Sequence, residues 1–314
     1  MTALRNLLIG KLATLGRAMG LEGLRDQITE SKLLTARVLI NQMKSVGLLE
    51  RIADAEFKVF SQFGDDGIIQ YLVHQINISA DSQTFIEFGV QDYQESNTRF
   101  LLMNDTWRGL ILDGSKSNIE KVIQGSDYWR HDLTAVTAFI DRDNINDLFI
   151  RHGFTGEIGL LSIDIDGNDY WVWERIEAVN PMIVVAEYNS TFGAQYAVTI
   201  PYDASFQRSR AHYSNLYWGA SLKAFCLLAE RKGYAFVGSN SAGNNAYFVR
   251  LDKLANIKPL DTVQGYVAAR FRESRNAEGD LTYLGSAARL HEISSMEVFD
   301  IEHAAMVRIA DLYK

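Results

Sequence analysis

The sequence predicts a doubly wound α/β domain, with a mostly parallel, Rossmann-like sheet covered by helices on both faces. Two observations support this fold class. From about residue 59 onward, short strands such as Thr84–Phe88 (TFIEF) and residues 182–186 (MIVVA) are continuous apolar runs, which is typical of strands buried on both faces. Stretches with helical character separate these strands, and such alternation produces a parallel sheet. The 314 residues allow about two domains, or one large core with extensions.

The strands can be placed in order along the chain. We expect strands at 84–88, 109–112, 134–140, 159–165 and 182–186, with a helix from about Ser96. Asp141 is expected to be the N-cap of a helix that runs to about His152. Further helices are expected over the segment with Trp171 and Trp173 and over residues 220–233.

The last two strands, residues 234–238 and Asn245–Arg250, are separated only by SNSAGN and are expected to form a hairpin. An antiparallel last strand is a feature of methyltransferase-type Rossmann sheets, and NAD-type sheets lack it.

The core is flanked by two extensions. Residues 1–58 are expected to be helical, 59–250 to form the core, and 251–314 to form a mixed, charged extension without an assigned structure. A first helix is indicated by apolar side chains at helical spacing, with basic residues between them: Leu4, Leu8, Leu12, Leu15 and Met19. Packing on the core or on a second subunit is favoured for it, and contact of residues 1–24 with a membrane surface is the alternative.

A second helical stripe follows and consists of Leu33, Ala36, Ile40 and Met43. It suits a dimer contact, so a homo-oligomer is expected.

Composition excludes several classes. The 31 basic and 39 acidic residues give a charge of −8 and a pI near 5.3, which argues against nucleic-acid binding. The single cysteine excludes a disulfide framework and a Cys-rich zinc site. The sequence has no run of 18 apolar residues and no signal peptide, so we expect a soluble cytoplasmic protein, at most associated with the inner membrane surface.

Acidic residues stand where strands end. Glu87 lies at the end of the first strand, Asp113 ends the second, Asp164 and Asp166 end the fourth, and Glu187 ends the fifth. Ligands of open α/β sheets bind at the carboxyl ends of strands, and an acid after the second strand commonly accepts hydrogen bonds from ribose hydroxyls. Acids also cap helices, but four strand ends together favour a ligand cleft.

The densest group of polar residues is Ser162-Ile-Asp-Ile-Asp-Gly-Asn-Asp169. If Asp164 and Asp166 lie on one strand, alternation directs both side chains to the same face. With Asn168, they would suit Mg²⁺ or Mn²⁺, or one of them could act as a general base. The structural alternative is that Asp164 bonds backbone amides and Asp169 caps the following helix.

The turn after the first strand, Glu87-Phe-Gly-Val-Gln-Asp-Tyr, keeps one of the three glycines of a pyrophosphate-binding turn. NAD and FAD are therefore disfavoured, and a nucleoside without phosphates is permitted. Further along, Glu187-Tyr-Asn189 and the loop with His212 and Tyr213 combine aromatic and polar side chains, which suits a sugar. His212 is a second candidate for the general base.

Several segments resemble a bacterial group related to the FkbM-type methyltransferases: TFIEFGVQDYQESNT, WRGLILDGS, LLSIDIDGNDYWVW, IVVAEYN, PYD and GNNAYFVR. The resemblance runs from about Ser61 to Arg250. It implies a class I fold that uses S-adenosylmethionine (SAM) and O-methylation, often of sugars. It places Glu87, Gly89 and Asp113 at the cofactor, and Asp164, Asp166 and Glu187 toward the acceptor. Ser115 is a further candidate for cofactor binding, and Asn189 and Tyr213 are further candidates for substrate binding. Members of the family have glycine where this chain has Gln91 and Tyr93.

Three functions are therefore predicted in order of preference. The first is a SAM-dependent O-methyltransferase acting on a sugar, a polysaccharide or a glycosylated metabolite, with Mg²⁺ or Mn²⁺ as an optional ion. The second is a metal-dependent glycosyltransferase using Asp164 and Asp166. The third is a non-catalytic scaffold that retains the fold and has lost the cofactor.

Overall fold

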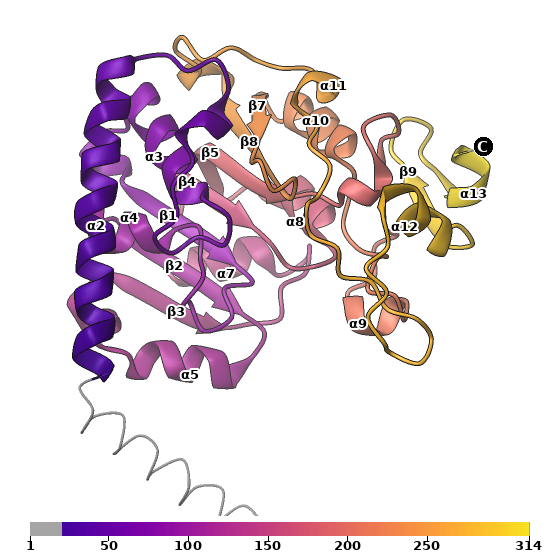
Figure 1. Cartoon of the computed structure of the whole chain (residues 1–314), viewed down its shortest axis with the longest axis horizontal. Helices are drawn as coiled ribbons and strands as arrows, with labels where there is room; N and C mark the ends of the chain where they lie inside the picture. The colour runs from indigo at the N-terminus through magenta and orange to yellow at the C-terminus, as the bar shows by residue number, and fades with distance from the viewer. Residues whose placement is uncertain (1–20, 314) are drawn as a thin grey trace, which may run out of the picture.

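The computed structural model describes residues 21–313, and the main element is a seven-stranded sheet (Figure 1). The strands, in the order in which they lie side by side, are β3 (Leu133–Thr137), β2 (Arg108–Asp113), β1 (Thr84–Phe88), β4 (Gly156–Ile163), β5 (Val179–Glu187), β8 (Asn245–Arg250) and β7 (Tyr234–Ser239). Each neighbouring pair is parallel except β5–β8 and β7–β8, which are antiparallel.

This strand order identifies the fold. The chain starts in the middle with β1, moves outward to β3, crosses to β4, and ends with a hairpin inserted beside β5. A single antiparallel strand next to the edge of an otherwise parallel sheet defines the class I methyltransferase fold. The predicted fold class and terminal hairpin are confirmed.

Helices cover both faces of the sheet. One face is covered by α2 (Leu21–Val46), α3 (Asp65–Ile76), α4 (Arg99–Asp105) and α5 (Lys116–Gln124). The other is covered by α7 (Ile145–Arg151), α8 (Asp169–Arg175) and α10 (Leu222–Arg231). Neighbouring strand residues alternate between the two cores: Phe85 packs on the first set of helices and Ile86 on the second. This two-sided burial is why the strands are apolar without interruption.

The long helix α2 packs on its own chain. Of the predicted stripe, Ala36 and Ile40 are buried beside Phe60 and Phe100, Leu33 packs against them, and Met43 joins the core under α3. The stripe proposed for a dimer contact is thus covered within the monomer, and a homo-oligomer stays a prediction. The first predicted helix lies in residues 1–20, outside the described part, so membrane contact also stays a prediction. Among the described residues, no helix is both long and apolar enough to span a membrane.

Three sequence-based expectations change in the structure. β3 ends at Thr137, before the expected position. Asp141 accepts hydrogen bonds from the backbone of Asp143 and Asn144 in a turn, and α7 starts only at Ile145, so the predicted N-cap is wrong. The short helices α5 and α6 (Ser126–Arg130) were not predicted.

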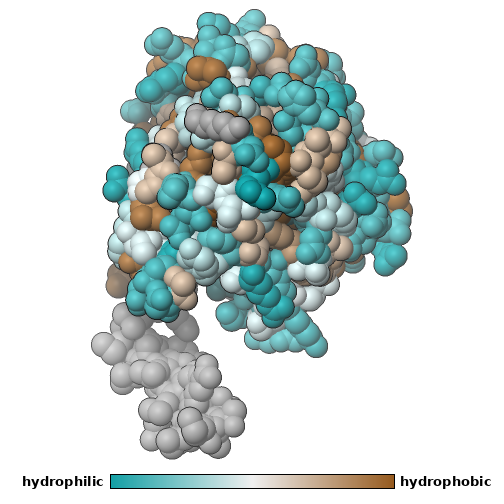
Figure 2. Space-filling model, turned by 90° about the vertical axis from the view of Figure 1, so that its right-hand side faces the viewer, coloured by the Kyte–Doolittle hydropathy of each residue, from teal (hydrophilic) through white to brown (hydrophobic). Residues whose placement is uncertain are grey.

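The C-terminal extension builds a second, smaller sheet. Its strands β9 (Glu297–Asp300) and β10 (Ala305–Arg308) pair with each other, and β9 also pairs with β6 (Val198–Thr199) from the loop after β5. Short helices α9 (Arg208–Ala211), α11 (Thr262–Gly265), α12 (Ser286–Glu292) and α13 (Ile309–Leu312) accompany it. Figure 2 faces this side of the molecule, where hydrophobic patches are interspersed among hydrophilic side chains.

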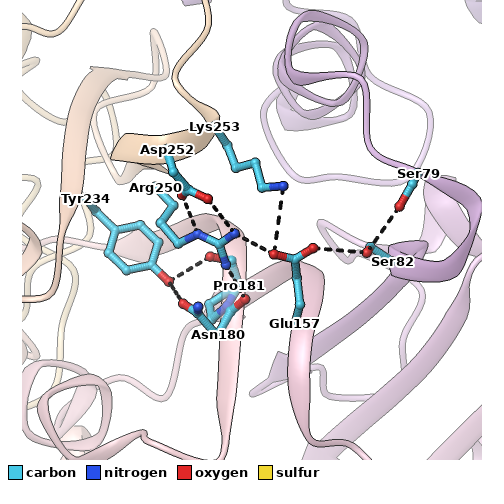
Figure 3. Close-up of polar contacts among 9 residues, drawn as sticks. All are labelled: Ser79, Ser82, Glu157, Asn180, Pro181, Tyr234, Arg250, Asp252 and Lys253. Carbon is cyan, nitrogen blue, oxygen red and sulfur yellow. Dashed lines mark hydrogen bonds and ion pairs between the residues drawn. The ribbon is translucent and has the colours of Figure 1, made fainter.

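The end of the sheet at which β4 and β5 begin is stabilised by an ionic cluster around Arg250 (Figure 3). The Arg250 guanidinium contacts Glu157 at 2.5 Å and Asp252 at 2.6 Å, and its Nη1 donates to the Asn180 carbonyl. Because these residues come from β4, β5 and the end of β8, the cluster ties the antiparallel strand to the parallel part. The cluster lies at the opposite end of the sheet from the acids that follow the carboxyl ends of the strands.

Candidate functional site

A cleft of about 390 Å³ opens at the carboxyl ends of β1, β2, β4 and β5. This volume is typical of small-molecule sites. The order of strands reverses between β1 and β4, so the cleft lies at the switch point where ligands of open α/β sheets bind. One side is lined from β1 to β3, the other from β4, β5 and the C-terminal extension. The predicted site residues in its lining are Gly89, Asp113, Asp164, Asp166, Asn168, Glu187 and Asn189.

The turn after β1 has the backbone of a glycine-rich turn with fewer glycines. Gly89, Gln91 and Tyr93 all have positive φ angles, at 70°, 49° and 60°. Left-handed backbone favours glycine, which accounts for the glycines that the resembling family has at the last two positions. Tyr93 is buried in the core, with its hydroxyl 3.0 Å from Thr98 Oγ1, and it does not narrow the cleft. Gln91 lines the cleft.

Asp113, at the end of β2, organises two loops at once. Its Oδ2 accepts the Gln91 amide at 2.8 Å, and its Oδ1 accepts the Ser115 amide at 2.8 Å. These bonds hold the β1 turn against the start of α5. Oδ1 also accepts the side-chain amide of Asn118 at 3.4 Å. A carboxylate has about four lone-pair sites, so Asp113 keeps capacity for about one further donor from the cleft, at Oδ2. Ser115 itself caps α5 by accepting the Asn118 amide, and it lies outside the cleft lining.

Glu87 lies beneath the turn and is buried. Its carboxylate accepts bonds from the hydroxyls of Ser96 and Thr98 and from the amides of Asn97 and Thr98. Burial raises the pKa of Glu87. Glu87 therefore fastens the segment before α4, and it lines a smaller adjoining cavity of about 160 Å³ and not the main cleft.

Two partly buried carboxyl groups lie close together on the other side of the cleft. Asp164 follows β4, Glu187 ends β5, and a carboxylate oxygen of each lies within 4.8 Å of the other. Burial raises the pKa of both well above the usual range, and the charges of the neighbouring acids raise them further. Two carboxyls this close share a proton more readily than both ionise. Glu187 Oε2 is buried and has no hydrogen-bond partner among the described residues.

Asp166 joins this group by a different route from the predicted one. Strand alternation does not place it, because β4 ends at Ile163 and Asp166 adopts a left-handed conformation with φ 55°. Asp164, Asp166 and Glu187 nevertheless each offer an oxygen within 4.8 Å of the others. Asp166 also forms an ion pair with Arg208 at 2.6 Å.

The loop that carries Asp166 is shaped by Asp169. The Asp169 carboxylate accepts the amides of Ile165 and Gly167, both at 2.8 Å, and burial raises its pKa to about 6. The expectation that Asp169 caps the following helix is therefore wrong: Asn168 is the N-cap of α8 and makes no side-chain cap hydrogen bond, and Asp169 instead holds the loop that precedes the helix. The neighbouring Asn168 donates to the Asp203 carbonyl, and its buried Oδ1 has no partner among the described residues.

The far wall includes residues that were not predicted as site residues: Phe206, Arg208, Trp218, Ala269, Phe271 and Arg289. Asn189 supports this wall, because its amide donates to the carbonyls of Leu216 and Trp218. Ala269, Phe271 and Arg289 come from the C-terminal extension. No strand or helix pattern in the sequence of that extension indicated that it would line the cleft. Arg208 and Trp218 belong to the aromatic loop that the sequence had indicated.

His212 and Tyr213 lie in that same loop but outside the cleft lining. His212 Nδ1 is 2.7 Å from Ser214 Oγ, and burial lowers its pKa. The Tyr213 hydroxyl donates to Glu292. Neither side chain is positioned to reach a ligand in the cleft.

No protein-family model matches the chain, and no curated protein matches it. Solved structures with a similar fold include the N-terminal domain of EvdMO1 with S-adenosylhomocysteine bound, with 10% identity over 68% of this chain and 94% of that chain, at a TM-score of 0.40. The Bacillus cereus O-methyltransferase in complex with the same molecule has 10% identity over 68% and 88%, at a TM-score of 0.36. The plantazolicin methyltransferase BamL has 11% identity over 68% and 78%, at a TM-score of 0.33. Likeness this distant says nothing of activity, and the fold assignment stands on the strand order.

Proposed function

We propose that this protein is a SAM-dependent O-methyltransferase that methylates a hydroxyl of a sugar or a glycosylated metabolite, and that it is related to the FkbM-type enzymes. One observation carries the proposal. In a sheet with methyltransferase strand order, the switch-point cleft has a left-handed turn at Gly89 and the Asp113 carboxylate on one side, and a pair of partly buried carboxyls on the other.

The first side fits the cofactor. Asp113 would accept a hydrogen bond from a ribose hydroxyl at Oδ2, as acids after the second strand commonly do. Gly89 lets the backbone approach closely, and the apolar residues after β3, Ala138 to Ile140, offer a surface for an adenine ring. The turn has no cluster of glycine amides for a pyrophosphate, which agrees with a nucleoside ligand.

The second side fits proton removal. SAM, when bound, supplies an electrophilic methyl group on a sulfonium. The Asp164–Glu187 pair, once one proton is lost, can accept the proton of an acceptor hydroxyl as its oxygen becomes the nucleophile. Raised pKa values bring the pair closer to neutral pH, where a general base is most effective. This replaces the roles predicted for Asp166 and His212, since Asp166 pairs with Arg208 and His212 lies outside the cleft.

The proposal also includes a binding site for a divalent cation. The three clustered carboxylates and the unpartnered Oδ1 of Asn168 are oxygen donors of the kind that Mg²⁺ and Mn²⁺ take. A cation here would offset the repulsion among Asp164, Asp166 and Glu187. Because metal-bound carboxylates are ionised, we propose Mg²⁺ or Mn²⁺ at this side of the cleft as the alternative to the shared proton, with the pair then holding the cation.

Calorimetric titration tests the proposal. We expect S-adenosylhomocysteine to bind the full chain in the micromolar range, and Asp113→Asn to weaken binding at least about tenfold by removing one acceptor oxygen. Asp132→Asn is the control, because that side chain is exposed and outside the cleft. Binding of a UDP-sugar with Mn²⁺, and not of S-adenosylhomocysteine, would favour the glycosyltransferase. Binding of neither would favour the scaffold.

A further inference from the structure

We propose that the acceptor is an anion: the molecule that presents the hydroxyl also carries a carboxylate or a phosphate, and Arg289 binds that group. The inference rests on the proposed function, because it names the class of molecule that would receive the methyl group. It concerns the wall of the cleft formed by Arg289 and Trp218, away from the residues assigned to the cofactor.

Arg289 is a buried cation that forms no ion pair with any described residue. Its residue is 7% exposed, and Glu273, the acid whose charge it feels, is ion-paired with Arg208 and Arg275. Its Nη1 donates to the Phe271 carbonyl, whereas its buried Nε has no hydrogen-bond partner among the described residues. Burial and the charge of Arg208 lower the pKa of Arg289, and the charge of Glu273 opposes them in part. An arginine stays charged in proteins, so this position is costly unless an anion accompanies it.

The free edge of Arg289 has the geometry for such an anion. With Nη1 bound to the Phe271 carbonyl, the Nε and Nη2 hydrogens remain as a parallel pair of donors. Two parallel N–H groups match the two oxygens of a carboxylate or phosphate. A side chain needed only to hold the Phe271 carbonyl would use one N–H and would have no need for a buried charge.

Trp218 adds a second unsatisfied donor. It is 6% exposed, lines the same cleft, and its indole Nε1 is buried without a partner among the described residues. An indole N–H only donates, so it too calls for an acceptor. Arg208, in contrast, is neutralised by Asp166 at 2.6 Å and stacks over the Trp218 ring at 4.8 Å. The unmatched charge of this wall is therefore that of Arg289.

The two walls together define a bifunctional acceptor. The Asp164–Glu187 pair suits a hydroxyl, which it can deprotonate, and it repels a carboxylate. Arg289 and Trp218 suit an anionic group and offer nothing to a neutral ring beyond hydrogen bonds. A hexuronate or a sugar phosphate has both groups, whereas a neutral hexose has only the first.

The test is calorimetric titration of the full chain saturated with S-adenosylhomocysteine, at low ionic strength. D-glucuronate and inorganic phosphate are the anionic probes, and D-glucose is the neutral match. We expect glucuronate to bind at least about tenfold more tightly than glucose, and Arg289→Gln to remove that preference. Arg289→Lys should keep part of it, since it retains the charge without the fork. Arg151→Gln is the control, because Arg151 is exposed and lies outside the cleft.

Trp218→Phe is a second test if Arg289→Gln does not fold, because it removes the N–H donor and keeps a smaller aromatic ring; we expect severalfold weaker binding of glucuronate. Equal binding of glucose and glucuronate, binding of neither anion, or unchanged binding in a folded Arg289→Gln protein would overturn the inference. Its failure is separable from that of the methyltransferase proposal. If S-adenosylhomocysteine does not bind but phosphate binds in an Arg289-dependent way, the anion site stands without methyl transfer.

Discussion

Gly89 and Asp164 touch across the switch point of the sheet: a Cβ placed on Gly89 would lie 1.6 Å from the Asp164 carbonyl oxygen. The contact joins the turn after β1, on the cofactor side, to the end of β4, on the acceptor side. Because the obstacle is backbone, it cannot move aside as a side chain would. Residue 89 therefore sets the spacing between the two halves of the cleft.

Gly89→Ala should destabilise the protein by more than about 3 kcal/mol, the sum of left-handed strain and overpacking, and should abolish S-adenosylhomocysteine binding. Gly233→Ala is the control. Gly233 also has a positive φ, 81°, but nothing lies within 4 Å of its added Cβ, so only the strain of about 1 kcal/mol is expected. Chemical denaturation measures the free energy of unfolding of both variants. Equal losses of stability would show that the contact between residue 89 and the Asp164 carbonyl has no role.

Gln91 and Tyr93 share a left-handed backbone but differ in what their side chains do. Gln91→Gly should stabilise the protein by up to about 1 kcal/mol, because the strain it relieves exceeds the gain in unfolded-state entropy. Tyr93→Gly should destabilise it by about 3–5 kcal/mol, because it removes a buried aromatic ring. Urea denaturation distinguishes them. A loss of stability in both variants would mean that the Gln91 side chain makes a stabilising contact of its own.

The carboxyl pair predicts a pH dependence of stability. The folded pKa values of Asp164 and Glu187 are raised, so above about pH 4 the folded state holds protons that the unfolded chain has released. The stability from the pair is complete below about pH 4 and is lost as pH rises through the folded pKa values. Glu187→Gln mimics the protonated form without this loss.

We therefore expect the melting temperature of Glu187→Gln to exceed that of the unchanged protein by about 2 °C or more at pH 8, and by less at pH 5. Glu120→Gln serves as the control, because Glu120 is exposed on α5 and pairs only with Lys116. An increase in the melting temperature of Glu187→Gln that is the same at both pH values would contradict the interpretation that Asp164 and Glu187 share a proton. Catalysis by the pair would in addition be lost in this variant.

The Arg250 cluster is expected to stabilise the fold without affecting the site. Arg250→Gln removes charged bonds to Glu157 and Asp252, and it should cost about 1–3 kcal/mol. Both acids are partly exposed, so water can solvate them afterwards. S-adenosylhomocysteine affinity should not change, because Glu157 and Asn180 lie at the start of β4 and β5, at the opposite end of these strands from the cleft. A tenfold change in that affinity would mean that the two ends are coupled.

The strands were predictable because each is a short apolar run between helices, and the structure confirms β1 and β8 at their expected bounds. The acids at strand ends were expected to meet, and Asp164, Asp166 and Glu187 do. The extension was not predictable, since its strands and helices are short and depend on distant partners. The Ile301 amide, for example, bonds the Ala197 carbonyl, and no local pattern records such a pairing. For the same reason, the sequence alone did not indicate that Arg289 belongs to the site.

The cleft is lined by residues that lie far apart in the chain. Gly89 and Asp113 come from the first half of the sheet, whereas Phe271 and Arg289 come from the last quarter of the chain. Mutations near the 3′ end of the gene can therefore alter the wall proposed for the acceptor while leaving the wall proposed for the cofactor unchanged.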